Sequence, residues 1–416
     1  MLKIPASFKN NGEDYITIPV IHNFAKSHGI KTTYKDKREE LLEKIIVYGN
    51  ESEENASVVL EWIDDVIQEG IKDIHLKYAP LSHEMEMLCK DKDQLISYLD
   101  SRVSINTSKH ICQNEYKKDF SLINIDIRSS DIGEKIVFMF CKRLYVHDVK
   151  QKHTKVIDYP VVAEYYFNGQ WLLIKAKPKS DLYVYSESTF NIDVNDSTTT
   201  EKQIREVLTK VKEILKIQDI DNRSAATKLK NRMFVLLDKY TTTPKEIIDV
   251  MSSKNEEILD ISNRLTDLCT VKDKCYSSDM IKDVEDDIKN IVEKYLSINW
   301  KEKDIFIQDR NAYPVKLSAT DEEESKVEQT AAACEPLQTK ALFFDNKKML
   351  YKNRSCDGIV FMWKRESPVG GQNAAFRVKM LVNSKGECIF KFTEYTVKED
   401  IENVIFSIVG ATEDTQ

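Results

Sequence analysis

The stretch from Phe120 to Tyr185 constrains the fold most, because its residues follow the two-residue period of β-strands. "SLINIDIRSS" alternates, "EKIVFMFCKRLYVHDV" is rich in β-branched and aromatic residues, and "YPVVAEYYFNGQWLLIKAK" predicts two further strands. Asn168-Gly169 lies between these last two strands, and this dipeptide accepts the positive φ angles of a tight hairpin turn. We therefore expect an antiparallel β unit in the middle of the chain.

Helical periods on both sides of this unit indicate an α+β protein. Residues 53–70 place Val59, Ile63 and Val66 on one helical face, and residues 199–299 repeat apolar residues at helical spacing. Thr243-Pro244 followed by Glu246 predicts a helix start with Thr243 as N-cap. Near the C-terminus, "TKALFFD" and "DGIVFMWKR" predict strands, "FRVKMLVNSKGECIFKF" a hairpin, and "VKEDIENVIFSIV" a terminal helix.

A chain of 416 residues exceeds one ordinary core, so we expect several domains. The patterns above predict five segments, which are an N-terminal helical hairpin module at 1–50, an acidic helical segment at 51–105, a basic antiparallel β unit at 106–190, a helical segment at 191–305, and a C-terminal α/β unit at 306–416 with an acidic loop at 317–337.

Charge is distributed unevenly along the chain. The net charge is −8, yet residues 141–180 hold 8 Lys or Arg against 3 Asp or Glu, whereas residues 51–100 hold 4 against 13. A local basic surface on an acidic protein can attract a polyanion. Ordinary variation of surface charge explains the same numbers.

No apolar run approaches the roughly 20 residues of a membrane span, and "MLKIPASFKNNGEDY" lacks the apolar core of a signal peptide. We therefore expect a cytoplasmic protein without membrane contact. The eight cysteines are scattered, and the closest pair, Cys269 and Cys275, lacks a second pair of ligands nearby. No metal site and no cofactor are predicted.

The N-terminal stretch "IPVIHNFAKSHGIKTTYKDKREELLEKI" predicts two short helices joined by an extended polar link. Ile21 and Phe24 lie on one face of the first helix, Gly29 ends it, and Ile30 follows as the apolar residue beyond the cap. The second helix turns Leu41, Leu42 and Ile45 inward, and Lys37 and Lys44 complete the pattern.

At residues 16–47 this pattern resembles the SAP family of helix–extended–helix modules, although the link carries "TTYKD" where the family commonly has a small residue and glycine. No family is recognised for the rest of the chain. The resemblance implies DNA contact near the start of the second helix, where a helix N-terminus also suits phosphate. The cations expected to serve it are Lys31, Lys35, Lys37, Arg38 and Lys44.

The central β unit offers a second set of candidate nucleic-acid-binding residues. "LIKAKPKSDLYVY" places lysines and tyrosines at alternating positions, so they share one strand face, and lysines beside aromatic rings suit phosphates and bases. An amphipathic strand with its lysines in water explains the same pattern. The candidates are Lys142, Arg143, Lys150, Lys152, Lys155, Lys175, Lys177, Lys179, Tyr183 and Tyr185.

Catalytic motifs are missing from the sequence. It has no phosphate-cradling glycine loop and no nucleophile elbow. A metal-dependent nuclease would need convergent carboxylates beside a lysine, and Asp158 and Glu164 precede "WLLIKAK" without an acid in the second strand. Carboxylates from distant segments can still converge in space, so whether the chain is an enzyme stays open, with no catalytic residue to name.

The sequence therefore predicts a non-catalytic DNA-binding protein that contacts phosphates, with a protein partner or a second copy bound through the helical segment 199–296. Its composition, rich in Lys, Ile and Asn, suggests the recognition subunit of a bacterial defence (antiviral) or DNA-processing complex. One alternative is a protein–protein adaptor without nucleic-acid contact, and a second is a divergent metal-dependent nuclease. The sequence does not specify the strand preference, the oligomeric state, the pathway or any small ligand.

Overall fold

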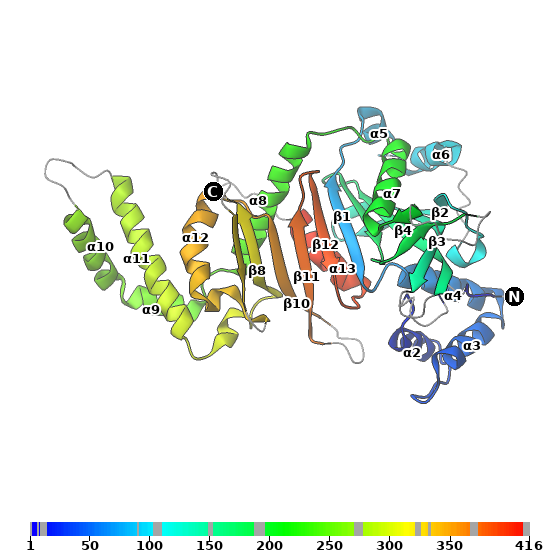
Figure 1. The fold of residues 1–416 in the computed structure, drawn as a ribbon, viewed down its shortest axis with the longest axis horizontal. Coiled ribbons are helices and arrows are strands. Elements are labelled where there is room, and N and C mark those ends of the chain that lie inside the picture. Colours follow the sequence, from blue (N-terminus) through cyan, green and yellow to red (C-terminus); the bar gives the residue numbers. More distant parts are fainter. Residues whose placement is uncertain are drawn as a thin grey trace. The chain divides into compact units, whose positions relative to one another are not determined.

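The computed structural model describes residues 2–5, 8, 15–89, 91–102, 110–148, 153–186, 196–269, 278–320, 326–331, 334–366 and 373–410. Helices and antiparallel strands both occur throughout, which confirms the α+β class (Figure 1). The chain divides into two compact units. Unit 1 lies within residues 1–226, 366–374 and 382–410, and unit 2 lies within residues 227–365 and 375–381.

Unit 1 begins with three helices and continues into strands that are covered by further helices. Its helices are α2 (Ile18–Ser27), α3 (Arg38–Gly49), α4 (Glu53–Val66), α5 (His83–Leu88), α6 (Lys92–Arg102), the 3-10 turn η1 (Ile111–Gln113), α7 (Thr200–Ile214) and α13 (Lys398–Val409). Its strands are β1 (Lys72–Tyr78), β2 (Ser121–Ser130), β3 (Gly133–Asp148), β4 (His153–Tyr166), β5 (Trp171–Ala176), β6 (Leu182–Val184), β7 (Ser197–Thr198) and β12 (Glu387–Phe392).

The strands of unit 1 follow the order β7-β6-β3-β4-β5-β1-β12, and the pairs are antiparallel. β3 pairs with β4 along one edge and divides its other edge between β2 and β6. The antiparallel strands predicted for the middle of the chain are therefore present. These strands also pair with β1, from the predicted acidic helical segment, and through β1 with β12, from the predicted C-terminal unit.

The β4–β5 connection is the hairpin that Asn168-Gly169 predicts, but its geometry differs. The strands end at Tyr166 and resume at Trp171, so four residues form the turn. Positive φ angles occur at Gly169 (78°) and at Gln170 (55°). Gly169 adopts a positive φ as expected, and the second residue with a positive φ is Gln170, which follows Gly169, and not Asn168, which precedes it.

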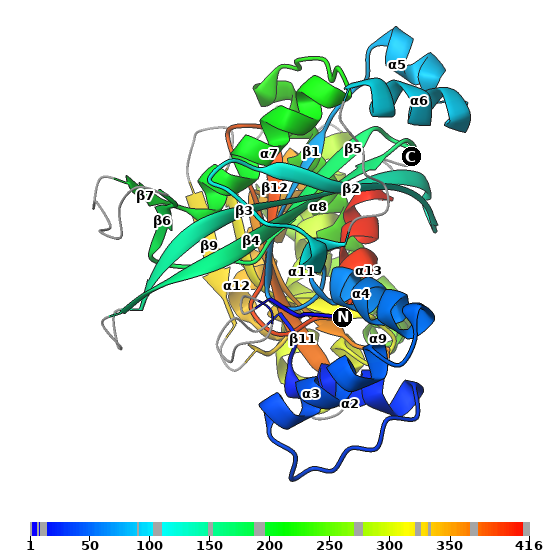
Figure 2. The same cartoon turned by 90° about the vertical axis from the view of Figure 1, so that its right-hand side faces the viewer.

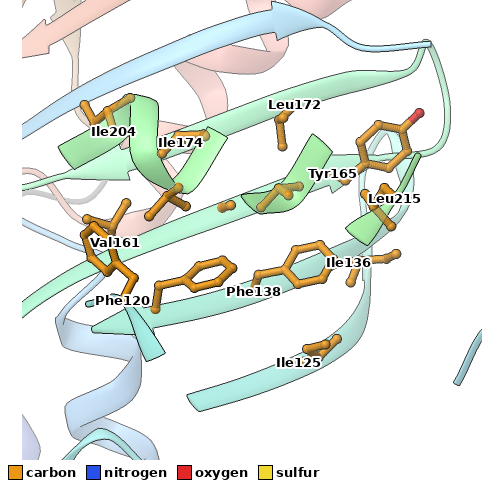
Figure 3. Close-up of a cluster of buried hydrophobic side chains, with 14 of the residues drawn as sticks. Phe120, Ile125, Ile136, Phe138, Val161, Tyr165, Leu172, Ile174, Ile204 and Leu215 are labelled. Atoms are coloured by element: carbon orange, nitrogen blue, oxygen red, sulfur yellow. The ribbon is translucent and has the colours of Figure 1, made fainter. Parts of the chain in front are cut away.

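Each face of the unit 1 sheet has its own core. Figure 3 shows the first, where Phe138 on β3, Leu172 on β5 and Ile204 on α7 are among the buried apolar side chains. The second core joins Met139 on the opposite face of β3 to the N-terminal helices, including Phe24 on α2 and Ile63 on α4. The apolar residues of α2 and α3 are thus used for packing against the rest of unit 1.

Unit 2 contains a helical part followed by strands. α8 (Asn222–Tyr240) runs from unit 1 into unit 2. The remaining elements are α9 (Lys245–Ser253), α10 (Asn255–Cys269), α11 (Ser278–Asn299), η3 (Lys303–Phe306), β8 (Ala312–Thr320), β9 (Lys326–Thr330), η5 (Leu337–Thr339), α12 (Ala341–Asn353), β10 (Gly358–Lys364) and β11 (Ala375–Val382). Antiparallel pairing links β11 to β10, β10 to β8 and β8 to β9.

Three local predictions in this part of the chain are wrong. "TKALFFD" is not a strand: α12 covers most of it, because Phe343, Phe344 and Leu350 repeat at helical spacing and are buried. The acidic loop at 317–337 is partly strand, since Lys316–Thr320 pairs with Lys326–Thr330. Thr243 does not cap α9, which starts after Pro244; its hydroxyl donates to Glu293 at 2.7 Å instead.

None of the described helices combines the length and the apolar character that a membrane span requires.

Candidate nucleic-acid interface

The first helix of the N-terminal module ends in a left-handed turn at Gly29. Gly29 has a φ of 70°, its amide donates to the Lys26 carbonyl at 3.4 Å, and the Ile30 amide donates to the Ala25 carbonyl at 2.8 Å. These two bonds form a Schellman motif, which turns the chain sharply out of α2. The predicted stop at Gly29, followed by Ile30, is confirmed.

Asp36 ties the polar link between the helices to α3. Its carboxylate accepts hydrogen bonds from the backbone amide and hydroxyl of Thr33 at 2.8 and 2.9 Å, and Lys44 Nζ donates to it at 2.6 Å. The hydrogen bond from Lys44, followed by those from Thr33, lowers the pKa of Asp36 to about 2. Lys44, a candidate cation, is therefore engaged in holding the link in place.

The rest of the link projects into solvent. Lys31, Lys35 and Lys37 are exposed, and the Tyr34 side chain is fully exposed at 102%. Figure 2 draws this segment as the dark blue loop between α2 and α3. We call Lys31, Tyr34, Lys35 and Lys37 the linker tip. Within the described residues its three lysines form no ion pair, so their charges face water.

The start of α3 is less open to phosphate than the sequence implies. The Lys37 amide donates to the Glu40 carboxylate at 2.8 Å, and Glu39 is exposed beside it. Arg38 is buried, with 6% of its surface exposed. A phosphate at this module would therefore meet the lysine ammonium groups of the linker tip, because Arg38 is buried and the Lys37 amide is already bonded to Glu40.

Most of the lysines expected on the central strand face are buried. Lys175 and Lys177 share one face of the sheet as predicted, but that face is interior, and they are only 3% and 6% exposed. Lys175 Nζ donates to Glu164 at 2.8 Å, and Lys177 Nζ lies 4.7 Å from the centre of the Tyr15 ring. The expectation that these lysines face water or phosphate is wrong, because Lys175 is paired with the buried Glu164 and Lys177 is covered by the Tyr15 ring.

Glu164 is the centre of this buried network. Lys135 Nζ also lies 3.4 Å from its carboxylate, and the Tyr166 hydroxyl donates to it at 2.8 Å. Burial alone raises the pKa of Glu164, but Lys175 and Lys135 outweigh it and lower that pKa to about 2. The same burial lowers the pKa of Lys175. The network is a compensated set of charges inside unit 1.

Lys142 and Arg143 on β3 also have protein partners. Lys142 is 5% exposed, and its ammonium donates to Glu206 at 2.6 Å. The Arg143 guanidinium donates to Asp158 at 3.1 Å and lies 5.8 Å from the Tyr185 ring. These contacts fix β3 to its neighbours in unit 1 and leave Lys142 out of reach of a nucleic acid.

The other central candidates are half-buried or lie outside the described residues. Lys155, Lys179, Tyr183 and Tyr185 are half-buried, and the last two lie near β6. Lys150 and Lys152 lie outside the described residues. Figure 2 shows β6 well apart from the loop between α2 and α3. The two sets of candidate cations therefore do not form a single continuous basic surface among the described residues.

The carboxylates considered for a nuclease do not converge. Asp158 is bound to Arg143, and Glu164 is enclosed by Lys175 and Lys135 farther along the same strand. Asp126 on β2 is bound to Arg128 at 2.6 Å. Among the described residues no group of three His, Cys, Asp or Glu side chains is arranged to hold a metal ion.

Comparisons of the chain with protein-family models, with curated proteins and with solved structures found no significant match. The resemblance to SAP modules therefore stays a prediction that depends on residues 16–47 alone.

Sequence reasoning overlooked two features of this region. Tyr34 lies in the link that departs from the SAP pattern, and its full exposure between lysines appears only in the structure. The pairing of Glu164 with Lys175 could have been found, because a hairpin at Asn168-Gly169 brings the two strands together with both side chains on one face. The register of that hairpin is the sequence signal that predicts this pairing.

Proposed function

We propose that this chain is a non-catalytic DNA-binding protein that contacts the phosphate backbone through the linker tip. The observation that supports the proposal is the exposure of Lys31, Lys35 and Lys37 around the fully exposed Tyr34. Ammonium groups attract phosphates, and an exposed ring stacks on an unpaired base. Contacts of this kind carry little sequence information, so little base readout is expected.

Binding through so few cations is weak, which suits a subunit of a larger assembly. A second DNA-binding subunit in the same complex would raise the effective concentration of DNA at the linker tip, and the combined affinity would exceed that of either part. We therefore propose that the chain is the recognition subunit of a bacterial defence or DNA-processing complex.

Charge reversal at the linker tip tests the proposal. The variant Lys31→Glu/Lys35→Glu/Lys37→Glu is compared with Lys202→Glu/Lys282→Glu/Lys301→Glu, which changes the net charge equally at exposed lysines elsewhere. Fluorescence anisotropy with a labelled 40-base-pair duplex and a labelled single strand is measured at low salt. We expect the first variant to bind at least about tenfold more weakly and the second to stay within about twofold of the unmodified protein. Equal losses in both variants would contradict the proposal.

A protein–protein adaptor remains the second candidate, and one observation favours it. The stripe at 199–216 is buried in the core of unit 1, but apolar residues of unit 2 helices are exposed. In α9, α10 and α11 those with exposures from 37% to 81% are Ile248, Ile261, Leu265, Leu268, Ile281, Ile291 and Tyr295. Within the predicted partner-binding segment 199–296, Ile281, Ile291 and Tyr295 of α11 are thus available for a partner or a second copy.

Light scattering coupled to size exclusion tests this candidate over a range of protein concentrations. A mass that rises from monomer to dimer, and that Leu268→Glu/Ile281→Glu returns to monomer, would support self-association through unit 2. A monomeric mass at every concentration would exclude a second copy as the partner.

A further inference from the structure

A groove in unit 1 lies between α2 and α4, on residues that the DNA-binding proposal does not use. Its volume is about 730 Å³. Val20 and Phe24 of α2 and Val58 and Trp62 of α4 line its walls, and Tyr395 and Val397 line it from the segment before α13. All of these residues belong to unit 1. The groove is large enough to receive several side chains of a peptide.

The floor of the groove is aromatic and apolar. The Phe24 ring stacks on Trp62 with 4.4 Å between centroids, and His28 stacks on the other side of Phe24 at 4.2 Å. Trp62 is only half-buried, although it belongs to the apolar face of α4. Part of a large aromatic side chain is thus left for contact with an apolar ligand.

Carboxylates form the rim. Glu61 and Asp65 are four residues apart on α4 and so lie on one side of that helix, and Glu69, which follows the end of α4, also lines the groove. No Lys or Arg is among the described residues that line it. Asp65 has one cation close by, because Arg128 lies 3.3 Å from its carboxylate, but Arg128 is shared with Asp126.

Glu69 shows that this negative charge is incompletely compensated. Its carboxylate accepts hydrogen bonds from the Tyr395 hydroxyl at 2.8 Å and from the Lys398 amide at 3.4 Å. Even so, burial raises its pKa, and the carboxylates of Glu399 and Asp65 add to the rise. A cation that entered the groove would relieve this repulsion.

We propose that the α2–α4 groove binds a basic amphipathic segment of a partner protein, with apolar side chains on the half-buried Val20, Val58 and Trp62 and lysine or arginine side chains against Glu61, Asp65 and Glu69. The apolar floor supplies burial, which is the main source of affinity in helix-in-groove recognition. The acidic rim selects basic segments and speeds their association. Nucleic acid is excluded from this groove because its phosphates would face the carboxylates.

The groove and the linker tip have opposite charge, so the module presents two surfaces for two kinds of partner. The proposal stands independently of DNA binding, since none of its residues belongs to the linker tip. Its failure and the failure of the DNA-binding proposal are therefore separately observable.

The test uses the full chain and a fluorescein-labelled 14-residue peptide of leucine and lysine at helical spacing. Two reference peptides carry glutamate in place of every lysine, or glycine in place of every leucine. Anisotropy titrations are made with the unmodified protein and with Glu61→Gln/Asp65→Asn, which keeps the shapes of the rim side chains. Asn23→Lys is a second variant, which places a cation among the lining residues without altering the core.

We expect the leucine–lysine peptide to bind at least about tenfold more tightly than either reference peptide. Both groove variants should weaken its binding at least about fivefold, and Glu53→Gln/Glu54→Gln, which removes two charges from the exposed start of α4, should leave it within about twofold. Equal binding of the glutamate peptide, undiminished binding by both groove variants, or an equal loss in the Glu53/Glu54 variant would overturn the proposal.

Discussion

Lys175 illustrates how a residue can match a functional pattern and still have a structural role. Its position two residues from Lys177 is typical of an exposed basic strand face, and Lys175 does lie in a strand, β5. The pattern does not state which face of a sheet is covered. That depends on residues far away in the sequence, because the Tyr15 ring lies against Lys177 and Glu402 of α13 joins the buried charges around Lys175. Burial of the two lysines therefore could not be predicted from their spacing.

The first prediction concerns Lys175→Met. Loss of the ammonium leaves the fully buried Glu164 with Lys135 alone, and breaking a buried pair costs about 3–5 kcal/mol of unfolding free energy. Urea unfolding followed by tryptophan fluorescence measures the loss. Lys391→Met, at an exposed position of β12, should change stability by less than about 0.5 kcal/mol.

The same two variants test the location of the interface. DNA affinity of folded Lys175→Met should equal that of the unmodified protein, because its side chain is enclosed by Glu164 and its neighbours. A stable Lys175→Met protein with weakened DNA binding would place this lysine on the surface and contradict the structure.

The second prediction is a pH dependence at Glu387. Burial raises its pKa, but hydrogen bonds from His75, Asn383 and Arg205 outweigh burial and lower the pKa from 4.5 to about 2. A carboxylate with a depressed pKa stabilises the folded state above its unfolded pKa, and this stabilisation is lost as the pH falls towards the folded pKa.

Glu387→Gln should therefore reduce the unfolding free energy by about 3 kcal/mol at pH 7, and the gap to the unmodified protein should close between pH 5 and pH 2. Urea unfolding at a series of pH values measures the gap. A gap that stays constant down to pH 2 would show that the Glu387 carboxylate is not specifically stabilised by Arg205 and His75.

At the scale of elements, the N-terminal module and the central strands were the most predictable parts. Capping at Gly29 and the alternation that predicts β2–β5 are local signals, and the cap and the four strands are both confirmed. The segment "TKALFFD" predicts a strand although it lies mostly in α12, because the aromatic pair Phe343 and Phe344 suits either structure. Only the later Leu350 completes the helical period. Short apolar runs carry this ambiguity in general.

The third prediction tests the cap of α2. Gly29 has a φ of 70°, and an added Cβ would meet no atom within 4 Å, so strain is the main cost of a side chain there. Gly29→Ala should destabilise the module by roughly 1 kcal/mol, and Gly29→Asn by less, because asparagine tolerates the left-handed region. Amide hydrogen exchange over residues 18–49 reports the change locally. An alanine variant that exchanges as slowly as the unmodified protein would contradict the Schellman geometry.

At the scale of the whole molecule, the pairing of distant strands could not be predicted. β1 pairs with β12, where Lys72 lies opposite Phe392, and neither strand carries a signal that names its partner. A division into consecutive segments misses such pairings, because it assigns neighbouring strands to different parts of the chain. The same limit applies to the candidate site. The sequence identifies the short link that carries the exposed lysines of the linker tip. The burial of Lys175 and Lys177 depends on packing between distant segments, which the sequence does not reveal.

Few of the candidate cations are exposed in the part of the chain that the structure describes. With a net charge of −8 and most central cations paired or buried, attraction of DNA depends on a small cationic tip. Each lysine that contacts a phosphate contributes about −0.9 to the slope of log affinity against log salt for duplex DNA. The slope therefore counts contacts, independently of the absolute affinity.

The salt dependence of DNA affinity is the most direct test of the claim that the linker tip binds the phosphate backbone. Anisotropy titrations from low to moderate salt should give a slope of about −2 to −3 for the unmodified protein, and Lys31→Ala/Lys35→Ala/Lys37→Ala should bring it close to zero. A slope that the triple alanine variant leaves unchanged, or an unmodified protein that binds no DNA even at the lowest salt, would contradict the claim that the linker tip binds the phosphate backbone.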